Sequence, residues 1–165
     1  MNGPDHGSSA SPAIHGGENH VESLLAERKI ERLLMAYATA LDKRDWAALD
    51  EVFTPDATAH YKSIGHFGSR AAMVSMFREY LERCGATQHL LGNMRVDVDG
   101  GKATATCYLQ AIHAGLGKHQ GKLLTVWGEY RDRLELRPAG WRIVHRELTV
   151  LHASGDIGQM DGAAD

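Results

Sequence analysis

A chain of 165 residues, 43% hydrophobic and 24% charged, is long enough to fold as one globular domain with its own core. Its net charge of −3 and scattered Lys and Arg residues exclude a nucleic-acid-binding surface and give no reason to expect a membrane as partner. No apolar run approaches the ~20 residues that a membrane helix needs, and no secretory signal is recognisable. Cys84 and Cys107 form no Cys-x-x-Cys pair, so we expect a cytoplasmic protein without disulfides.

Residues 1–20 are rich in Gly, Ser, Pro and His and are predicted to form a disordered tail. The domain is expected over residues 21–153, followed by a flexible C-terminal tail over residues 154–165. A long helix is predicted from Val21, because apolar residues recur at spacings of three and four. These residues are Ile30, Leu33, Leu34, Tyr37, Ala38 and Leu41.

Asp42 falls at the end of this helix, on the edge of the apolar stripe. Its carboxylate is therefore expected to point inward, where an Asp is seldom buried unless something pairs with it. Downstream, His89 and His113 are candidate partners. An inward Asp beside inward His residues is the usual equipment for moving a proton.

Two shorter helices are predicted after the long one. Asp45 is expected to cap the first, which Thr54-Pro55-Asp56 ends. A strand over residues 57–61 follows, and Ser69 is expected to cap the second helix, which ends near Cys84. The apolar stripe of this second helix is typical of core packing.

After Gly85 the apolar pattern changes from the helical period to the alternation of strands. His113 falls on the small, apolar face of its strand. Helices followed by hairpin-linked strands predict an α+β fold, with helices packed on one face of a mostly antiparallel sheet. The four strands are predicted over residues 87–98, 102–114, 122–136 and 141–151. Apolar residues at even positions of the last two strands predict an outer sheet face that another subunit covers. These residues are Val126, Tyr130, Val144 and Leu148.

Six segments carry a combined pattern of acidic, aromatic and apolar residues: Tyr37–Trp46, Val52–Ala57, Thr87–Asn93, Val98–Ala103, Gly128–Leu134 and Trp141–Arg146. Together they resemble the SnoaL-like branch of the nuclear transport factor two-like superfamily, over about residues 21–153. Scytalone dehydratase, bile-acid 7α-dehydratase and hexachlorocyclohexane dehydrochlorinase belong to this branch. The resemblance implies a cone-shaped α+β barrel, in which a curved sheet wraps around the long helix and leaves an apolar pocket. It also implies a homo-oligomer, with a trimer favoured over a dimer.

The resemblance further implies that Asp42, His89 and His113 are catalytic. Asp42 matches the catalytic Asp of the dehydratases and the dehydrochlorinase, and His89 matches the His that serves as base. His113 matches a second His placed beside the same Asp. For binding the substrate, the resemblance points to Tyr61, which matches a tyrosine that helps to hold a carbonyl, and the same pocket is expected to include Tyr37, Trp127 and Tyr130.

These residue types suit proton transfer without a cofactor. A neutral imidazole can abstract a proton near pH 7, and a carboxylate on its other ring nitrogen fixes the tautomer. We therefore expect a cofactor-independent lyase or isomerase, with dehydration of a small, largely apolar carbonyl or hydroxyl compound as the specific reaction. The ten His residues form no His-x-x-x-His or His-Glu-x-x-His pattern, so no metal is expected.

Other interpretations stay open at this point. The same residues would serve polyketide ring closure or the elimination of halide, since this fold hosts many activities. Leu41 stands where the dehydratases have a tyrosine, so the identity of their substrate is not inferred for this chain. Asp42 could merely cap the next turn and His113 could be a structural His. A non-catalytic binding module, or a structural subunit such as an oxygenase β subunit, would be favoured by an Asp42–His89 separation above ~6 Å.

Overall fold

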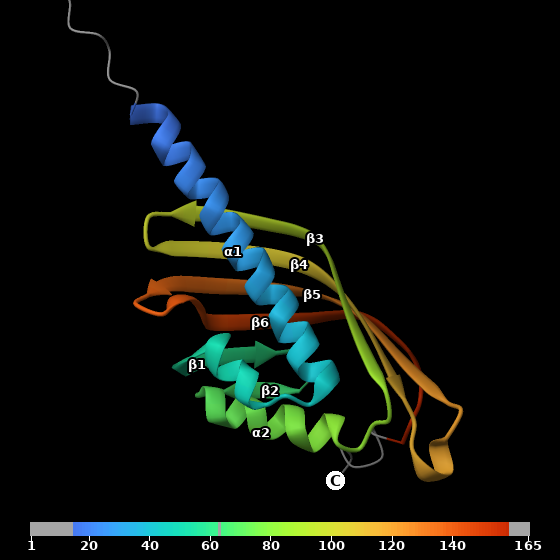
Figure 1. Ribbon diagram of the computed structural model, residues 1–165. Coiled ribbons are helices and arrows are strands. Elements are labelled where there is room, and N and C mark those ends of the chain that lie inside the picture. The colour runs from blue at the N-terminus through green and yellow to red at the C-terminus, as the bar shows by residue number, and fades with distance from the viewer. Residues whose placement is uncertain (1–14, 63, 159–165) are drawn as a thin grey trace, which may run out of the picture.

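The computed structural model describes residues 15–62 and 64–158, and the outer parts of both predicted tails, residues 1–14 and 159–165, lie outside this range. Helices occupy one part of the fold and a sheet the other (Figure 1). The elements in chain order are α1 (His15–Lys43), η1 (Ala47–Glu51), β1 (Phe53–Tyr61), β2 (Gly65–Phe67), α2 (Arg70–Leu81), β3 (Thr87–Asp99), β4 (Lys102–Ala114), η2 (Gly117–His119), β5 (Leu123–Arg137) and β6 (Gly140–Gly155).

The strands form one curved sheet in the order β2-β1-β6-β5-β4-β3. Neighbouring strands run antiparallel, except that β1 and β6 run parallel. The long helix α1 crosses one face of the sheet, and α2 lies beside β1 and β2 (Figure 1). The core fills the space between α1 and this face. The predicted α+β architecture, with helices packed on a mostly antiparallel sheet, is confirmed.

Irregular pairing bends the long strands. The register shifts between Gly92 and Arg95 in β3, and again where β5 and β6 meet at Gly128. Such bulges increase the local twist and turn a strand away from its original direction. A Cβ at Gly128 would lie 2.8 Å from the carbonyl oxygen of Thr149, so only glycine lets the two strands approach this closely.

The start of α1 differs from the prediction. The helix begins at His15, before the expected start at Val21, so residues 15–20 are helical rather than part of a tail. Its first turns extend beyond the edge of the sheet (Figure 1). Apolar side chains there remain about half exposed, at 55% for Val21, 50% for Leu24 and 55% for Leu25. With no sheet to pack against, these turns need no buried stripe, which is why residues 15–20 show no apolar period.

One of the two short helices begins as predicted, and the other begins one residue later. The side chain of Ser69 accepts a hydrogen bond from the backbone N–H of Ala72 (3.1 Å) at the start of α2. The Asp45 side chain also accepts a hydrogen bond from the backbone N–H of Ala48 (3.2 Å), but the cap residue of the 3-10 helix η1 is Trp46 instead of Asp45. Both contacts satisfy backbone donors that the first turn of a helix leaves free.

The strand β1 starts earlier than predicted and includes Pro55, which was expected to lie in a helix break. Proline has no N–H to donate to a sheet. The pairing of β1 with β6 is interrupted between Phe53 and Thr58, so Pro55 falls where no ladder bond is needed. The strand β2 was not predicted, because three residues are too few to show a periodic pattern.

The predicted outer face is wrong for three of its four residues. Val126 packs against the core from the inward, even face of β5. Tyr130 and Leu148 are buried in the core, with 3% and 6% of their surface exposed. In β5 the even positions face inward throughout, and in β6 a register shift near Arg133 moves the inward face from odd to even positions. A shift of one residue reverses which side chains face the core.

The chain end also differs from the predicted flexible tail. The strand β6 continues to Gly155, and Ile157 is 5% exposed. Its side chain packs in a small cluster with Cys84 and Leu124, which lie at the end of α2 and the start of β5. The chain therefore packs against the rest of the domain at least as far as Ile157.

Replacement of Ile157 by Ala should lower the free energy of unfolding by about 2 kcal/mol, because it leaves a cavity in this cluster. Chemical denaturation measures the change, with Leu151→Ala as control, since Leu151 is 66% exposed and its loss should matter little. Equal stabilities of the two variants would show that the segment after Gly155 does not pack.

Candidate active site

Asp42 and His89 form a hydrogen-bonded pair where α1 ends and β3 begins. Nδ1 of His89 lies 2.7 Å from Oδ1 of Asp42. The backbone N–H of His89 donates to Oδ2 of the same carboxylate (2.9 Å), and the Thr87 hydroxyl donates to Oδ1 (3.1 Å). The side chain of His89 is 6% exposed and that of Asp42 is 23% exposed. The pair is thus in direct contact, well inside the ~6 Å limit set above.

The pKa of the Asp42 carboxyl reflects this set of donors. Burial alone would raise its pKa. The side-chain and backbone hydrogen bonds from His89, together with the one from Thr87, outweigh burial and lower the pKa below its usual value. Asp42 is therefore ionised at neutral pH and can accept a hydrogen bond from the Nδ1–H of His89, and in the imidazole tautomer with that proton Nε2 is the basic ring nitrogen.

His113 lies beside this pair on the inner face of the sheet. Its register partner on β3 is Thr87, and that of His89 on β4 is Ala111, so both imidazoles project from the same face. The His89 and His113 rings meet edge to face with centroids 5.5 Å apart, and Tyr80 contacts His113 in the same way at 5.5 Å. We call Asp42, Thr87, His89 and His113 the acid–base group.

Burial keeps His113 neutral. Its surface is only 4% exposed, and Nδ1 has no side-chain hydrogen-bond partner among the described residues. Burial, and to a smaller extent the neighbouring His89, lower its pKa to about 4. His113 can accept or donate a hydrogen bond, but it is not a cation at neutral pH.

A second polar cluster lies in the core. The hydroxyl of Tyr37 is 3.5 Å from that of Tyr61 and 3.3 Å from that of Tyr130, and all three residues are buried. Burial raises the pKa of Tyr61 and Tyr130 well above the usual value, so both phenols stay protonated and can donate hydrogen bonds.

An ion pair holds these tyrosines in place. Arg146, 0% exposed, donates from Nε and Nη2 to the two carboxylate oxygens of Asp132, each at 2.7 Å. Its guanidinium lies over the rings of Tyr37 (4.0 Å) and Tyr130 (4.2 Å), while Nη1 is buried without a partner among the described residues. We call Tyr37, Tyr61, Tyr130, Asp132 and Arg146 the tyrosine–arginine group.

Sequence reasoning missed Arg146, which was not among the residues expected in the site. Burial alone would lower the pKa of Arg146, but Asp132 raises it well above its usual value, so the pair stays charged. The available signal was the alternation in β5, where charged residues fill the odd positions from Glu129 to Arg137 and Asp132 interrupts an otherwise apolar even face.

Trp127 belongs to neither the acid–base group nor the tyrosine–arginine group. It pairs with Gln110 of β4, while its neighbour Val126 pairs with the buried Ala111. Trp127 therefore lies on the outer face, where it stacks on His152 at a centroid distance of 5.4 Å. Of the expected substrate-binding residues, Tyr37, Tyr61 and Tyr130 face the interior and Trp127 does not.

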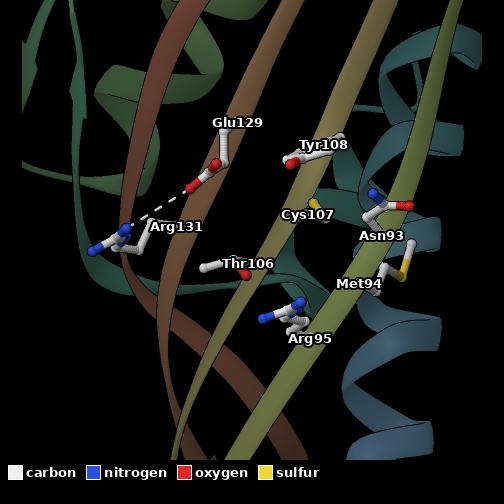
Figure 2. Close-up of a pocket in the computed structure, with 8 residues that line it drawn as sticks. All are labelled: Asn93, Met94, Arg95, Thr106, Cys107, Tyr108, Glu129 and Arg131. Carbon is white, nitrogen blue, oxygen red and sulfur yellow. Dashed lines mark ion pairs between the residues drawn. The ribbon is translucent and has the colours of Figure 1, made fainter.

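Two surface hollows lie on the outer side of the sheet. One, of about 460 Å³, opens at the β3 bulge between Arg95, Tyr108 and the ion pair of Glu129 with Arg131, and α1 lies behind the sheet in this view (Figure 2). The other, of about 540 Å³, lies nearer the β3–β4 turn. Neither hollow is lined by the acid–base group.

Two further features concern the described residues as a whole. No three His, Cys, Asp or Glu side chains within residues 15–62 and 64–158 lie close enough together to ligate a metal ion. No helix in this part of the chain is long and apolar enough to cross a membrane.

Comparison with known proteins identifies the family. The profile of the SnoaL-like domain matches residues 22–147. The chain belongs to the SnoaL-like family. A relative, the uncharacterized protein Rv2910c of Mycobacterium tuberculosis (strain ATCC 25618 / H37Rv), is 34% identical over 124 residues, which cover 73% of this chain and 82% of the relative.

Similarity to solved structures shows a nuclear transport factor 2-like fold. A candidate aromatic ring hydroxylase from Novosphingobium aromaticivorans has a TM-score of 0.74 and 26% identity over 86% of this chain and 98% of that one. A candidate scytalone dehydratase from the same species has 0.73 and 23%, covering 85% and 91%. Hexachlorocyclohexane dehydrochlorinase LinA-type3 from Novosphingobium barchaimii has 0.71 and 16%, covering 82% and 92%.

The buried His113 should make the protein less stable in acid. Its pKa is about 4 in the folded protein and 6.5 in an unfolded chain, so the unfolded state binds the proton first. The free energy of unfolding should fall as the pH drops from 6.5 towards 4, by up to about 3 kcal/mol.

Replacement of His113 by Phe should remove this part of the pH dependence, as measured by urea denaturation at several pH values. His20→Gln serves as control, because His20 is exposed on α1. A profile for His113→Phe that is as steep as that of the native protein would contradict the assignment.

Proposed function

We propose that the protein is a cofactor-independent lyase or isomerase in which His89 is the general base and Asp42 its partner. The 2.7 Å contact between Nδ1 of His89 and the Asp42 carboxylate is the observation that carries the proposal. This contact directs Nε2 of His89 away from the carboxylate, and a neutral imidazole held in one tautomer is suited to proton abstraction near pH 7.

The proposed reaction removes a proton and then a hydroxyl group. Nε2 of His89 takes a proton from a carbon next to a carbonyl, and the electron pair of the broken C–H bond delocalises into the carbonyl as an enolate. Asp42 stabilises the imidazolium that forms. When the enolate collapses, the bond from the neighbouring carbon to the hydroxyl breaks and the imidazolium returns its proton, so that water leaves and His89 is neutral again.

The remaining polar groups would hold the substrate. Tyr61 and Tyr130 stay protonated, so their hydroxyls, with that of Tyr37, could donate hydrogen bonds to a carbonyl or enolate oxygen. The buried cation of Arg146 favours negative charge on that oxygen. Neutral His113 would serve as a second hydrogen-bonding group beside the base.

The proposed substrate is a small and largely apolar carbonyl or hydroxyl compound, because the interior side of the sheet is apolar apart from these two groups. Dehydration is the favoured reaction. Isomerisation, polyketide ring closure and elimination of halide would use the same base, and the structural likenesses to a candidate dehydratase and a dehydrochlorinase support this range of eliminations.

The rival proposal is a non-catalytic binding module or structural subunit, such as an oxygenase β subunit. The likeness to a candidate aromatic ring hydroxylase is the observation that favours it. A structural subunit has no use for a low-pKa carboxylate that fixes an imidazole tautomer, so we favour the enzyme.

We further infer a homo-oligomer, with a trimer favoured over a dimer by family resemblance. Its support is the outer sheet face, where Leu90, Gln110, Trp127 and His152 form a continuous row across four strands. Tyr108 (54% exposed) and Leu151 (66% exposed) lie close to this row.

Light scattering should give the native protein three times the mass of one chain, and the variant Trp127→Arg should have a smaller mass. A native protein and a variant that both have the mass of one chain would contradict the inference.

Replacement of His89 by Ala or Asp42 by Asn should abolish turnover while the fold is kept. The first change removes the base and the second removes the charge that stabilises the imidazolium, so rates should fall about 10²–10⁴-fold. A screen of hydroxy-ketones and phenols, first by thermal shift and then by turnover, identifies the substrate for this measurement.

Replacement of Trp127 by Phe is the matched control, because Trp127 lies on the other face of the sheet and should leave turnover unchanged. If both site variants keep the full rate on the true substrate, the pair is not catalytic. A stable complex with a large iron-dependent partner and no turnover would favour the structural subunit instead.

A further inference from the structure

Arg44 ties together the three segments that meet at the acid–base group. It follows directly after α1 and adopts a left-handed backbone conformation, with φ of 57°. Its guanidinium donates to the carbonyl oxygens of Leu41 (2.7 Å), Leu81 (2.9 Å) and Gly85 (3.1 Å). One side chain thus joins the end of α1, the end of α2 and the loop before β3.

The same guanidinium reaches the acid–base group through one hydroxyl. Nη1 of Arg44 donates to Oγ1 of Thr87 (2.8 Å), and Thr87 in turn donates to Oδ1 of Asp42 (3.1 Å). A hydroxyl has only one hydrogen. Because Arg44 occupies an acceptor position of Thr87, the hydrogen of this hydroxyl is directed to the carboxylate.

Arg44 does not bind the Asp42 carboxylate itself. Among the described residues it forms no ion pair, and its one direct contact with Asp42 is a long one to the backbone carbonyl (3.4 Å). A direct pair would occupy the carboxylate oxygens with a charged donor. Instead, both oxygens remain in contact with β3: Oδ1 with Thr87 and the His89 ring, and Oδ2 with the His89 backbone.

We propose that Arg44 is a positioning residue that acts through the Thr87 hydroxyl to fix the Asp42 carboxylate, and so holds the proton of neutral His89 on Nδ1. In this relay the guanidinium orients the hydroxyl, the hydroxyl orients the carboxylate, and the carboxylate selects the tautomer. The functional meaning of the tautomer rests on the proposed function, since only this tautomer leaves Nε2 free as a base.

The left-handed conformation supports this role. A positive φ is uncommon for residues other than glycine and is kept only when the surroundings fix it. Here it turns the chain back at the end of α1, so that the Arg44 side chain points to Thr87 instead of continuing along the helix. Lysine could not replace these contacts, because one ammonium cannot span the carbonyls and the hydroxyl as a planar guanidinium does.

Thr87 provides the sharpest test, because it separates the relay from the structural contacts of Arg44. Thr87→Val removes the hydroxyl, keeps the branched shape and leaves the bonds from Arg44 to Leu41, Leu81 and Gly85 intact. Thr87→Ser keeps the hydroxyl and is the matched control. Arg44→Met removes the relay together with the structural contacts.

The measurement is ¹⁵N NMR of the full chain with labelled histidine above pH 8, where imidazoles are neutral. Comparison with His89→Gln assigns the His89 signals. The native protein and Thr87→Ser should show His89 with its proton on Nδ1, whereas Thr87→Val and Arg44→Met should lose this pattern in favour of the Nε2–H form.

A native tautomer in Thr87→Val overturns the proposal, as does an Nε2–H form in the native protein. If Arg44→Met does not fold, the comparison of Thr87→Val with Thr87→Ser still tests whether the Thr87 hydroxyl fixes the tautomer of His89. Because no substrate is needed, this result is independent of turnover: a relay that holds in a protein without activity would contradict the proposed function and leave the role of Arg44 intact.

Discussion

The hydrogen bond between Asp42 and His89 is the interaction on which the rest of the site depends. A carboxylate at the end of a helix is ordinarily solvated, and placing it against a sheet requires donors for its oxygens. Here β3 supplies them from the backbone and side chain of His89 and from Thr87. The end of α1 and the start of β3 are therefore fixed relative to each other by the same contacts that, in the proposed function, prepare an imidazole for proton transfer.

The interior tolerates a second polar group because its two opposite charges are paired with each other. Asp132 and Arg146 face each other on β5 and β6, and the tyrosine rings cover the guanidinium. Breaking such a buried pair by removing one partner typically costs about 3–5 kcal/mol. The core thus combines an apolar shell with two polar clusters, one suited to moving protons and the other to holding an oxygen that carries negative charge.

Local patterns predicted the parts of the structure that local physics determines. The stripe of α1, the cap Ser69 and the hairpin before Lys102 follow from spacing and turn chemistry. The proximity of Asp42 to His89 came from family resemblance, since nothing local joins residues 47 positions apart. The register shifts were not predicted, and because one of them reverses the face of β6, Leu148 was assigned to the wrong side of the sheet. The contacts of Arg44 likewise depend on the folded chain.

Deuterium exchange at carbon tests the central claim, that His89 abstracts a proton from a carbon acid, most directly. The protein is incubated in D₂O with a ketone that binds it, and incorporation next to the carbonyl is followed by mass spectrometry. The account predicts exchange well above the rate without protein, and a fall to that rate in His89→Ala. Equal incorporation by the native protein and this variant would contradict it.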